Sequence, residues 1–367
     1  MPLTVTLTVV TAVLLPVSIL CCTLLLRAAR AHHSNSKLAT TVPPPSPWRL
    51  PLARVVNLSE LLAGFAKDVI GRIVFGASAA TRADGWGAKV DALLEEGNAL
   101  LGTFHVADYF PSLAWVGALD GTDAKVGKAF DRIDAVLEEI VDAAERRDAP
   151  GRHDSTFVDV LLSLGNNTSG NGAGGAAPER RFTRDNVKGL LANLFGAGAD
   201  SIIIVLEWAM AELLRNKDAM EKLQDELRTR LLATYTRMIK ETMRLHPPGP
   251  LLIPREAMEP ARIQRYDVPS KTMVIVNAWA IGRDPGSWES PEEFRPERFL
   301  GTGGEVDFRG RHFQLVPFGY GRRVCPGINF TMSIMEIAIA NLVGRFDWAL
   351  PKGATRNDSS NLKAHFF

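Results

Sequence analysis

Cysteine is scarce in this chain. Three cysteines are present among 367 residues, and two of them, Cys21 and Cys22, lie in an apolar run near the N-terminus. The third, Cys325, has no cysteine to pair with in the rest of the chain. This distribution excludes a disulfide framework in the soluble part, which suits a domain that faces the reducing cytosol.

Neither sign of charge is in excess. The formal net charge is +1, and this balance gives no reason to expect nucleic acid as a partner. The few basic clusters are interpreted as solvated surface. No internal repeat is apparent, and 46% of the residues are hydrophobic, which is enough for the core of one large domain in a chain of this length.

The N-terminus lacks charged side chains from residue 1 to residue 26. At about 1.5 Å per residue, a helix of this length spans a hydrocarbon core of about 30 Å, so residues 1–26 are predicted to form a transmembrane anchor. A cleaved signal peptide is the alternative, because Ala29-Arg-Ala31 resembles a cleavage site. The missing positive n-region and the long apolar run argue against it. Arg27, Arg30 and Lys37 place the downstream side in the cytoplasm.

A basic and proline-rich linker is predicted at residues 27–51, and its end at 43–51 is expected to be a stiff polyproline spacer. The remainder, residues 52–367, is predicted to be a mainly α domain with a small β part. Strand-like pieces such as Met273–Asn277 are few. Apolar residues at helical spacing predict helices at 61–73, 123–147, 157–164, 186–214 and 221–245. Thr183 and Asp185 are the capping candidates of the fourth helix.

Ten residues, Phe318-Gly-Tyr-Gly-Arg-Arg-Val-Cys-Pro-Gly327, place Cys325 in a loop before an apolar helix that is predicted to start at Ile328. The sulfur is therefore expected near a helix N-terminus, which stabilises a thiolate. A lone buried cysteine is more often a small hydrophobic residue, but this context favours a thiolate presented to a haem iron. Backbone that turns sharply or approaches a flat ring needs the glycines of the loop: Gly319, Gly321 and Gly327.

This loop resembles the haem-binding loop of the cytochrome P450 monooxygenases. The resemblance implies that the Cys325 thiolate ligates the iron of haem b, with Phe318 and the loop glycines beside the ring. Arg323 and, by resemblance, Arg255 are expected to pair with haem propionates, because a guanidinium group suits carboxylates.

Two further motifs follow the order of the family. Glu241-Thr-Met-Arg244 resembles its Glu-x-x-Arg helix, and Pro296-Glu-Arg298-Phe299 resembles its next signature. His246, which follows the first motif, is interpreted as part of a structural turn and not as a ligand. Since an unpaired buried charge is costly, the resemblance implies a fully paired scaffold network of three side chains: Glu241, Arg244 and Arg298.

The middle of the long helix, Ala197-Gly-Ala-Asp-Ser-Ile202, resembles the oxygen-activation segment of the family. The resemblance implies that Gly198 lets the helix approach the ring and that Asp200 and Ser201 relay protons to dioxygen. Taken alone, the segment could also be a core helix with one polar patch. Ser201 stands where the family usually has threonine, so its hydroxyl is expected to be less tightly aimed. The expected substrate pocket includes Ala197, Gly198, Leu251, Leu252 and Ile253.

The resemblance covers residues 56 to about 350, but segments of the family are missing. They include the first sheet and the region above the haem, which would follow Pro51, and a loop within residues 221–245. The closing β hairpin of the family is also not recognisable. The chain is therefore identified as an internally deleted member of the family.

The resemblance implies a microsomal plant-type monooxygenase of secondary metabolism. It is expected in the endoplasmic reticulum membrane, with its catalytic domain facing the cytosol. The implied partners are NADPH-cytochrome P450 reductase, O2, a lipophilic small molecule and the membrane. The alternative is an inactive haem-binding or non-folding remnant. A third option is a haem-thiolate isomerase or dehydratase that needs no reductase, and the Asp200–Ser201 pair argues against it.

Overall fold

The computed structural model describes a large part of the chain in two compact units. Of the described residues, one unit contains those between 60 and 200, and the other contains residues 57–59 and those between 201 and 349. The predicted anchor at 1–26 and the predicted linker at 27–51 lie outside the described residues, which are 57–75, 89, 96–97, 99–100, 105–113, 115–119, 121–146, 156–167, 183–228, 232–300 and 306–349.

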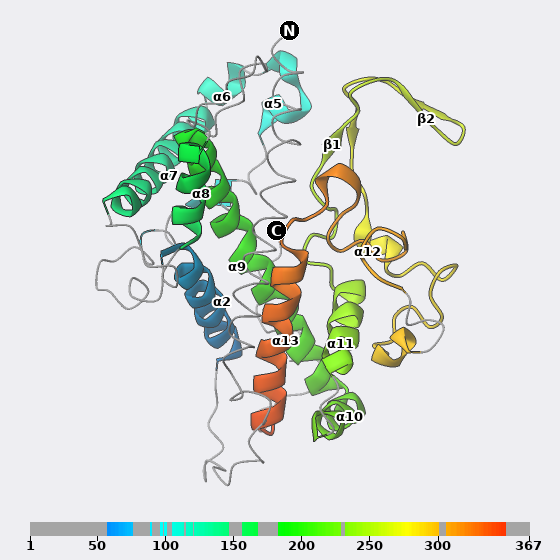
Figure 1. The fold of residues 1–367 in the computed structure, drawn as a ribbon. Helices are drawn as coiled ribbons and strands as arrows, with labels where there is room; N and C mark the ends of the chain where they lie inside the picture. The colour runs from blue at the N-terminus through cyan, green and yellow to red at the C-terminus, as the bar shows by residue number, and fades with distance from the viewer. Residues whose placement is uncertain are drawn as a thin grey trace, which may run out of the picture. The chain divides into compact units, whose positions relative to one another are not determined.

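Helices dominate the described residues (Figure 1), so the predicted mainly α class with a small β part is confirmed. The elements in chain order are α2 (Leu58–Phe75), α5 (Val106–Tyr109), η1 (Pro111–Leu113), α6 (Trp115–Leu119), α7 (Thr122–Glu145), α8 (Phe157–Asn167), α9 (Arg184–Arg215), α10 (Lys217–Arg228), α11 (Leu232–Leu245), β1 (Arg255–Glu256), β2 (Ala261–Ile263), β3 (Tyr266–Val268), β4 (Met273–Val274), α12 (Ala278–Ile281), η2 (Pro296–Phe299), η4 (Gly321–Arg323) and α13 (Ile328–Arg345).

In the unit of residues 60–200, α2 has one apolar stripe. Its residues at spacings of four are buried: Leu62, Ala66, Ile70 and Val74. This periodicity is the reason that the segment forms a helix and packs one face inward. A Cβ at Gly198 of α9 would lie 3.1 Å from Cδ1 of Ile70. The glycine therefore admits the Ile70 side chain, a reason for this residue that the sequence does not reveal.

The start of α9 is fixed by a cap and by charge. The backbone N–H of Asn186 donates to Thr183 Oγ1 at 3.3 Å, and the backbone N–H of Thr183 donates to Asn186 Oδ1 at 2.9 Å. Thr183 is thus the cap, in a reciprocal arrangement that satisfies two N–H groups. The positive charges of Arg184 and Lys188 are unfavourable beside the positive N-terminal end of the helix dipole. Carboxylates of α7 balance them, with Lys188 Nζ 2.8 Å from Asp134 and Arg184 Nε 2.6 Å from Glu138.

The unit of residues 201–364 has a core of long apolar side chains from α11 and α13. The most deeply buried are Met238, Ile239, Met243, Met335 and Ile339, all at 1% exposure or less. A polar contact crosses the same pair of helices, since Thr236 Oγ1 donates to Glu336 Oε1 at 2.5 Å. Long, unbranched methionines fill an irregular interface between two helices well.

The single helix predicted at 221–245 is wrong, because the structure has two helices, α10 and α11, with residues 229–231 between them outside the described part. The contacts of Glu226 show that α10 and α11 do not form one straight helix. Its carboxylate accepts hydrogen bonds from Thr234 Oγ1 and, at 2.9 Å, from Arg237 Nη2. In a straight helix, residues eight apart are separated by about 12 Å along the axis. The chain must therefore turn between α10 and α11.

The β part consists of two small antiparallel sheets. β1 pairs with β4 in the register Arg255↔Val274, and β2 pairs with β3 in the register Arg262↔Asp267. The strand predicted at Met273–Asn277 is shorter in the structure and ends at Val274. Gln264 makes the tight turn between β2 and β3 with a φ of 54°.

One helix of the described residues, α9, is long and apolar enough to cross a membrane. A core helix of a soluble domain passes the same test. The buried carboxylates of Glu207 and Glu212 favour a core helix, because a charge in a lipid interior is costly. The predicted anchor at residues 1–26 lies outside the described residues.

Gly282, directly after α12, has no room for a side chain. A Cβ there would lie 2.2 Å from the backbone oxygen of Arg244, which cannot rotate away. We expect Gly282→Ala to lower the free energy of unfolding by about 1–3 kcal/mol or more, measured by denaturant unfolding. Gly286→Ala is the matched control, because its Cβ would meet only the Asp284 carboxylate at 3.4 Å. Equal stabilities of the two variants would contradict this account.

Candidate functional site

The loop that carries Cys325 is closed by its own backbone. The N–H of Cys325 donates to the carbonyl of Phe318 at 3.0 Å, and the N–H of Val324 donates to Gly321 at 3.1 Å. Gly319 and Gly321 have φ values of 70° and 76°, in the left-handed region that favours glycine. Both glycines are therefore required by the turn that positions the cysteine.

The sulfur of Cys325 is half-buried just before α13. Gly327 is the N-cap of that helix, and its carbonyl accepts from the N–H of Thr331 at 2.8 Å. Burial raises the pKa of the Cys325 thiol, and a hydrogen bond from the Gly327 N–H lowers it only in part. The thiolate form of Cys325 stays a prediction, and the Gly327 N–H acts in the predicted direction. Desolvation opposes the charged form of the thiol, and a bound cation would favour it.

Two arginines near this loop have guanidinium groups available for carboxylates. Arg255 lies against the loop, because a Cβ on Gly319 would be 3.6 Å from its Nη2. Arg323 is exposed at the end of η4. Within the described ranges, neither arginine forms an ion pair with a carboxylate of the chain. A thiol, a loop that turns on glycines and two available arginines are the groups that a haem with two propionates needs. The donor set therefore fits haem.

Phe318 is half-buried and packs edge-on against Phe308, with ring centroids 4.9 Å apart. Lys240 of α11 lies 5.8 Å from the centroid of Phe308. Burial lowers the pKa of Lys240, against the opposing charge of Asp307. The Cys325 loop is thus held by the contact between Phe308 and Phe318, and Lys240 of α11 packs on that pair.

The structure brings together Glu241, Arg244 and Arg298, as the resemblance implies. Arg244 donates from Nε and Nη2 to the two carboxylate oxygens of Glu241 at 2.8 and 2.9 Å, and Arg298 Nε donates to Glu241 Oε1 at 2.9 Å. Glu241 and Arg244 are fully buried. The two guanidinium carbons lie 5.3 and 5.9 Å from the ring centroid of Trp288. Every charge of the network is paired, as burial requires.

Arg244 also binds the backbone of the segment that follows α12. Its Nη1 donates to the carbonyls of Gly282 and Pro291, both at 2.6 Å, and its Nη2 donates to Glu293 at 3.0 Å. The sequence does not predict these contacts, because a carbonyl acceptor leaves no signature in the residue type. The network therefore joins α11 to residues 282–298 as well as pairing charges.

His246 is half-buried in a structural cluster with Trp208 and Glu212, in agreement with its interpretation as part of a turn. Its ring stacks on Trp208 of α9 with centroids 3.8 Å apart and an interplanar angle of 3°. Its Nε2 lies 2.9 Å from Glu212 Oε1. Burial lowers the pKa of His246, and Glu212 offsets this only in part. The neutral imidazole is thus the favoured form at neutral pH.

The lowered pKa of His246 predicts a stability that falls in acid. The unfolded chain, with a pKa near 6.5, binds the proton more readily, so stability is lost as the pH falls below about 6.5. One proton contributes a slope of at most about 1.4 kcal/mol per pH unit. His246→Gln keeps a donor without titrating and is expected to flatten the slope between about pH 7 and about pH 5. Thermal midpoints measured at both pH values test this, and an unchanged slope in the variant would count against it.

The predicted oxygen-activation residues lie on α9. Asp200 and Ser201 are consecutive and half-buried, and Ala197 is exposed on the preceding turn. Gly198 contacts Ile70, as described above. The boundary between the two units falls between Asp200 and Ser201. The structure therefore describes the segment that is predicted to relay protons separately from the Cys325 loop.

The predicted pocket residues after α11 are more exposed than expected. Leu251 is 49% exposed and Ile253 is 81% exposed. Leu252 is held at a φ of 51°, in a turn closed by its N–H to the Gly249 carbonyl at 3.0 Å. The sequence predicts an apolar lining here. In the structure this segment presents apolar side chains that nothing in the described part covers.

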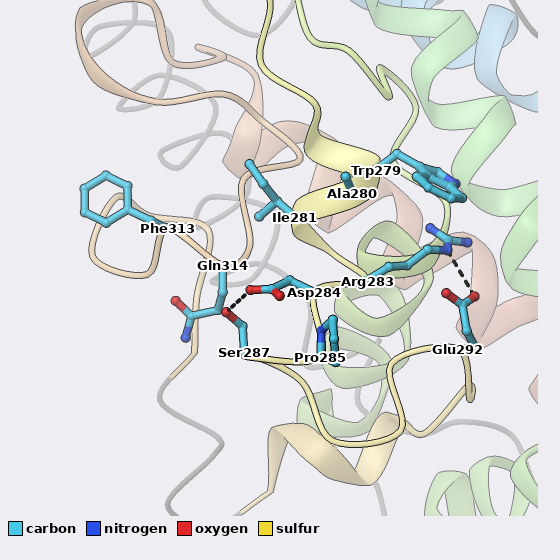
Figure 2. Close-up of a pocket in the computed structure, with 10 residues that line it drawn as sticks. All are labelled: Trp279, Ala280, Ile281, Arg283, Asp284, Pro285, Ser287, Glu292, Phe313 and Gln314. Atoms are coloured by element: carbon cyan, nitrogen blue, oxygen red, sulfur yellow. Dashed lines mark hydrogen bonds and ion pairs between the residues drawn. The ribbon is translucent and has the colours of Figure 1, made fainter. Parts of the chain in front are cut away.

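A surface hollow of about 870 Å³ lies beside α12 (Figure 2). Its charged side chains are engaged with their neighbours, since Arg283 Nε lies 3.2 Å from Glu292 and Ser287 Oγ donates to Asp284 at 2.9 Å. None of the site residues predicted from the sequence lines it. The hollow is therefore separate from the candidate site.

Comparison with known proteins gives a family. A family model described as Cytochrome P450 matches residues 46–366. Cytochrome P450 71A1 of Persea americana and Cytochrome P450 71A8 of Mentha piperita are each 41% identical to the chain over 83% of its length. The chain covers 62% and 61% of these two relatives, which is less than two thirds of their length.

Solved structures agree with this result. A zebra fish cytochrome P450 with progesterone has a TM-score of 0.64 and 26% identity, over 82% of this chain and 66% of that chain. A second zebra fish structure, with abiraterone, has a TM-score of 0.60. The similar plant sequences and these folds agree with the family and plant type that the motifs indicate.

Proposed function

Since this chain belongs to the cytochrome P450 family, we propose that it is a haem-thiolate monooxygenase that inserts one oxygen atom of O2 into a lipophilic small molecule. The observation that supports this best is the Cys325 loop, which presents one half-buried sulfur between left-handed glycines and the start of α13. No disulfide competes for that sulfur in the described residues.

Haem is the cofactor of this family, and when bound it supplies the reduction and cleavage of dioxygen with electrons from a reductase. Cys325 Sγ is proposed to hold the iron as a thiolate, with the Gly327 N–H donating to the sulfur. Arg255 and Arg323 are proposed to pair with the propionates. Such charge-assisted pairs with guanidinium groups are short and strong, so they would orient the group on the loop.

Asp200 and Ser201 are proposed to deliver protons. The carboxyl group of Asp200 would give a proton to Ser201 Oγ, whose own proton would pass to the oxygen being reduced. Two consecutive polar residues in an apolar helix, both half-buried, are suited to this relay. A hydroxyl both donates and accepts, which a relay needs.

Ser201→Thr is expected to lower the hydrogen peroxide formed per NADPH consumed. The β-branch of threonine disfavours the other χ1 rotamers by about 0.5–1.5 kcal/mol. This free energy corresponds to a roughly two- to tenfold higher population of the rotamer that directs the hydroxyl toward the dioxygen. Peroxide yield against NADPH oxidation measures the effect. Ser201→Ala is the control and should raise the yield. Equal yields in the serine and threonine proteins would remove the idea.

The chain is further proposed to lie in the endoplasmic reticulum membrane, with its catalytic domain in the cytosol and NADPH-cytochrome P450 reductase as its electron donor. The uncharged N-terminal run and the plant relatives support this. Arg322 is exposed on the loop and is proposed to meet an acidic surface of the reductase. Apolar residues around the predicted pocket support a lipophilic substrate, in keeping with plant secondary metabolism.

The proposed function is tested by the carbon monoxide difference spectrum of the reduced full-length chain, followed by NADPH turnover with a reductase. A thiolate-type band with turnover is expected. One alternative is an inactive or non-folding remnant, and absence of haem uptake would support it. A thiolate band without reductase-dependent turnover would instead favour an isomerase or dehydratase.

A further inference from the structure

Lys240 of α11 is a largely buried cation that the proposed mechanism does not use. Its side chain is 12% exposed, and its Nζ lies 3.9 Å from Oδ1 of Asp307. That carboxylate is shared, because Oδ1 also accepts from the N–H of Phe308 at 2.7 Å and Oδ2 lies 3.4 Å from Nε of Arg309. A buried ammonium group is costly unless its contacts replace the lost water. Asp307 therefore compensates the charge of Lys240 only in part.

A carbonyl and two aromatic rings supply further compensation. Nζ of Lys240 donates to the carbonyl of Val306 at 3.0 Å. It also lies 5.7 and 5.8 Å from the ring centroids of Phe299 and Phe308, which are both 4% exposed. A cation within about 6 Å of a ring centroid is attracted to the ring, and more strongly where water is excluded. One ammonium group thus holds both the backbone at Val306 and the ring of Phe308.

Phe308 connects this cation to the cysteine loop. Its ring packs edge-on against Phe318 with centroids 4.9 Å apart, and the carbonyl of Phe318 accepts the N–H of Cys325 at 3.0 Å. The position of Lys240 is itself fixed, because the next residue of α11 is Glu241, which is fully buried in its ion pair. The contacts therefore run from a buried anchor on α11 to the backbone that holds the sulfur.

We propose that Lys240 is a positioning residue for Cys325, and that its ammonium group sets, through Phe308 and Phe318, the direction in which the sulfur is presented. The inference rests on the proposed function only for what the sulfur binds, a haem iron. Methionine has a similar length and would fill the same space, so packing alone does not need a cation here. Arginine keeps the cation and stacks on aromatic rings. Arginine should therefore replace Lys240, and methionine should not.

Alkylation of Cys325 by iodoacetamide in the haem-free full-length chain tests this proposal. With Cys21 and Cys22 changed to serine, Cys325 is the only thiol. At a fixed pH, Lys240→Met should raise the alkylation rate by about five- to thirtyfold, whereas Lys240→Arg should keep the rate of the parent. Lys222→Met is the matched control and should have no effect, because Lys222 is 64% exposed. Equal rates for the methionine and arginine variants would overturn the proposal.

A double-mutant cycle in the haem-loaded chain gives a second readout that does not depend on activity. Transfer of haem to apomyoglobin is measured for Lys240→Met, for Phe308→Leu and for the double variant. Each single change should speed the loss of haem, and the double variant should be no faster than the faster single variant, because both changes remove the same contact. Additive effects, or haem loss at the rate of the parent, would contradict the proposed path.

Two provisions keep the outcome decisive. Circular dichroism identifies a methionine variant that fails to fold, in which case Lys240→Gln, which keeps a donor for the Val306 carbonyl but no charge, replaces it with the same expectation. If the parent chain takes up no haem, the proposed function fails. The alkylation rates of the haem-free chain then still decide whether Lys240 positions the sulfur.

Discussion

Replacing Glu241 by glutamine is expected to destabilise the unit of residues 201–364 by about 3–5 kcal/mol, which is the usual cost of removing one partner from a buried ion pair. Both carboxylate oxygens of Glu241 accept from Arg244, and Oε1 also accepts from Arg298 and from the N–H of Arg295. An amide leaves two guanidinium groups without a counter-charge, one of them fully buried. Because whole domains are stable by only about 5–15 kcal/mol, this loss removes a large part of the free energy of unfolding.

Glu297→Gln is the matched control for this experiment. Glu297 lies next to Arg298 in the sequence and pairs with Lys222 at 2.7 Å, but both side chains are exposed, by 45% and 64%. Its loss should cost less than about 1 kcal/mol. Urea unfolding of the two variants and of the parent gives the loss in free energy of unfolding for each. Similar midpoints for both variants would show that burial of the Glu241 network does not increase its contribution to stability.

Replacing Cys325 by serine is expected to abolish the thiolate-type carbon monoxide band and to bring oxygenation below detection, with the fold retained. A hydroxyl is a far poorer anion than a thiol, and the push of electron density toward O–O cleavage depends on the thiolate. The loop should survive, because its backbone bond from residue 325 to Phe318 does not use the side chain. Visible spectra of the reduced protein, with circular dichroism for the fold, measure both parts.

The informative control is Cys325→His, which offers a neutral nitrogen ligand. It should bind haem with a nitrogen-type spectrum and no oxygenation. If the serine variant keeps a thiolate-type band, another sulfur holds the iron and the assignment of Cys325 is wrong. If the parent chain already shows nitrogen coordination, the proposed monooxygenase function is overturned together with it.

Much of the fold could be predicted from the sequence because it depends on local periodicity. The helices α2, α7, α8 and α9 lie within a few residues of their predicted positions, since apolar residues recur at helical spacing in each. The break between α10 and α11 was missed because the residues there are themselves helix formers. Glu226 contacts Thr234 and Arg237 across this break, and no local pattern indicates such contacts.

The candidate site could be predicted in part, because its key residues stand in compact motifs. The role of the Cys325 loop and the pairing of Glu241 with Arg244 were predicted from their resemblance to motifs of the family. The raised pKa of the Cys325 thiol could not be predicted, because it depends on burial by residues distant in the chain. The exposure of Leu251 and Ile253 was also missed, since an apolar residue indicates a buried position only when something is present to cover it.

The contacts of Arg244 with several turns couple the local unfolding of residues 282–298 to that of α11. Its guanidinium group contacts carbonyls at residues 282, 291 and 293 in addition to Glu241. Residues 282–298 have little regular structure, and a segment of this kind would ordinarily exchange its amide hydrogens quickly. Anchored to a buried cation, the segment can open only when the end of α11 opens. Amide hydrogens in both places should therefore exchange with deuterium at a common, slow rate.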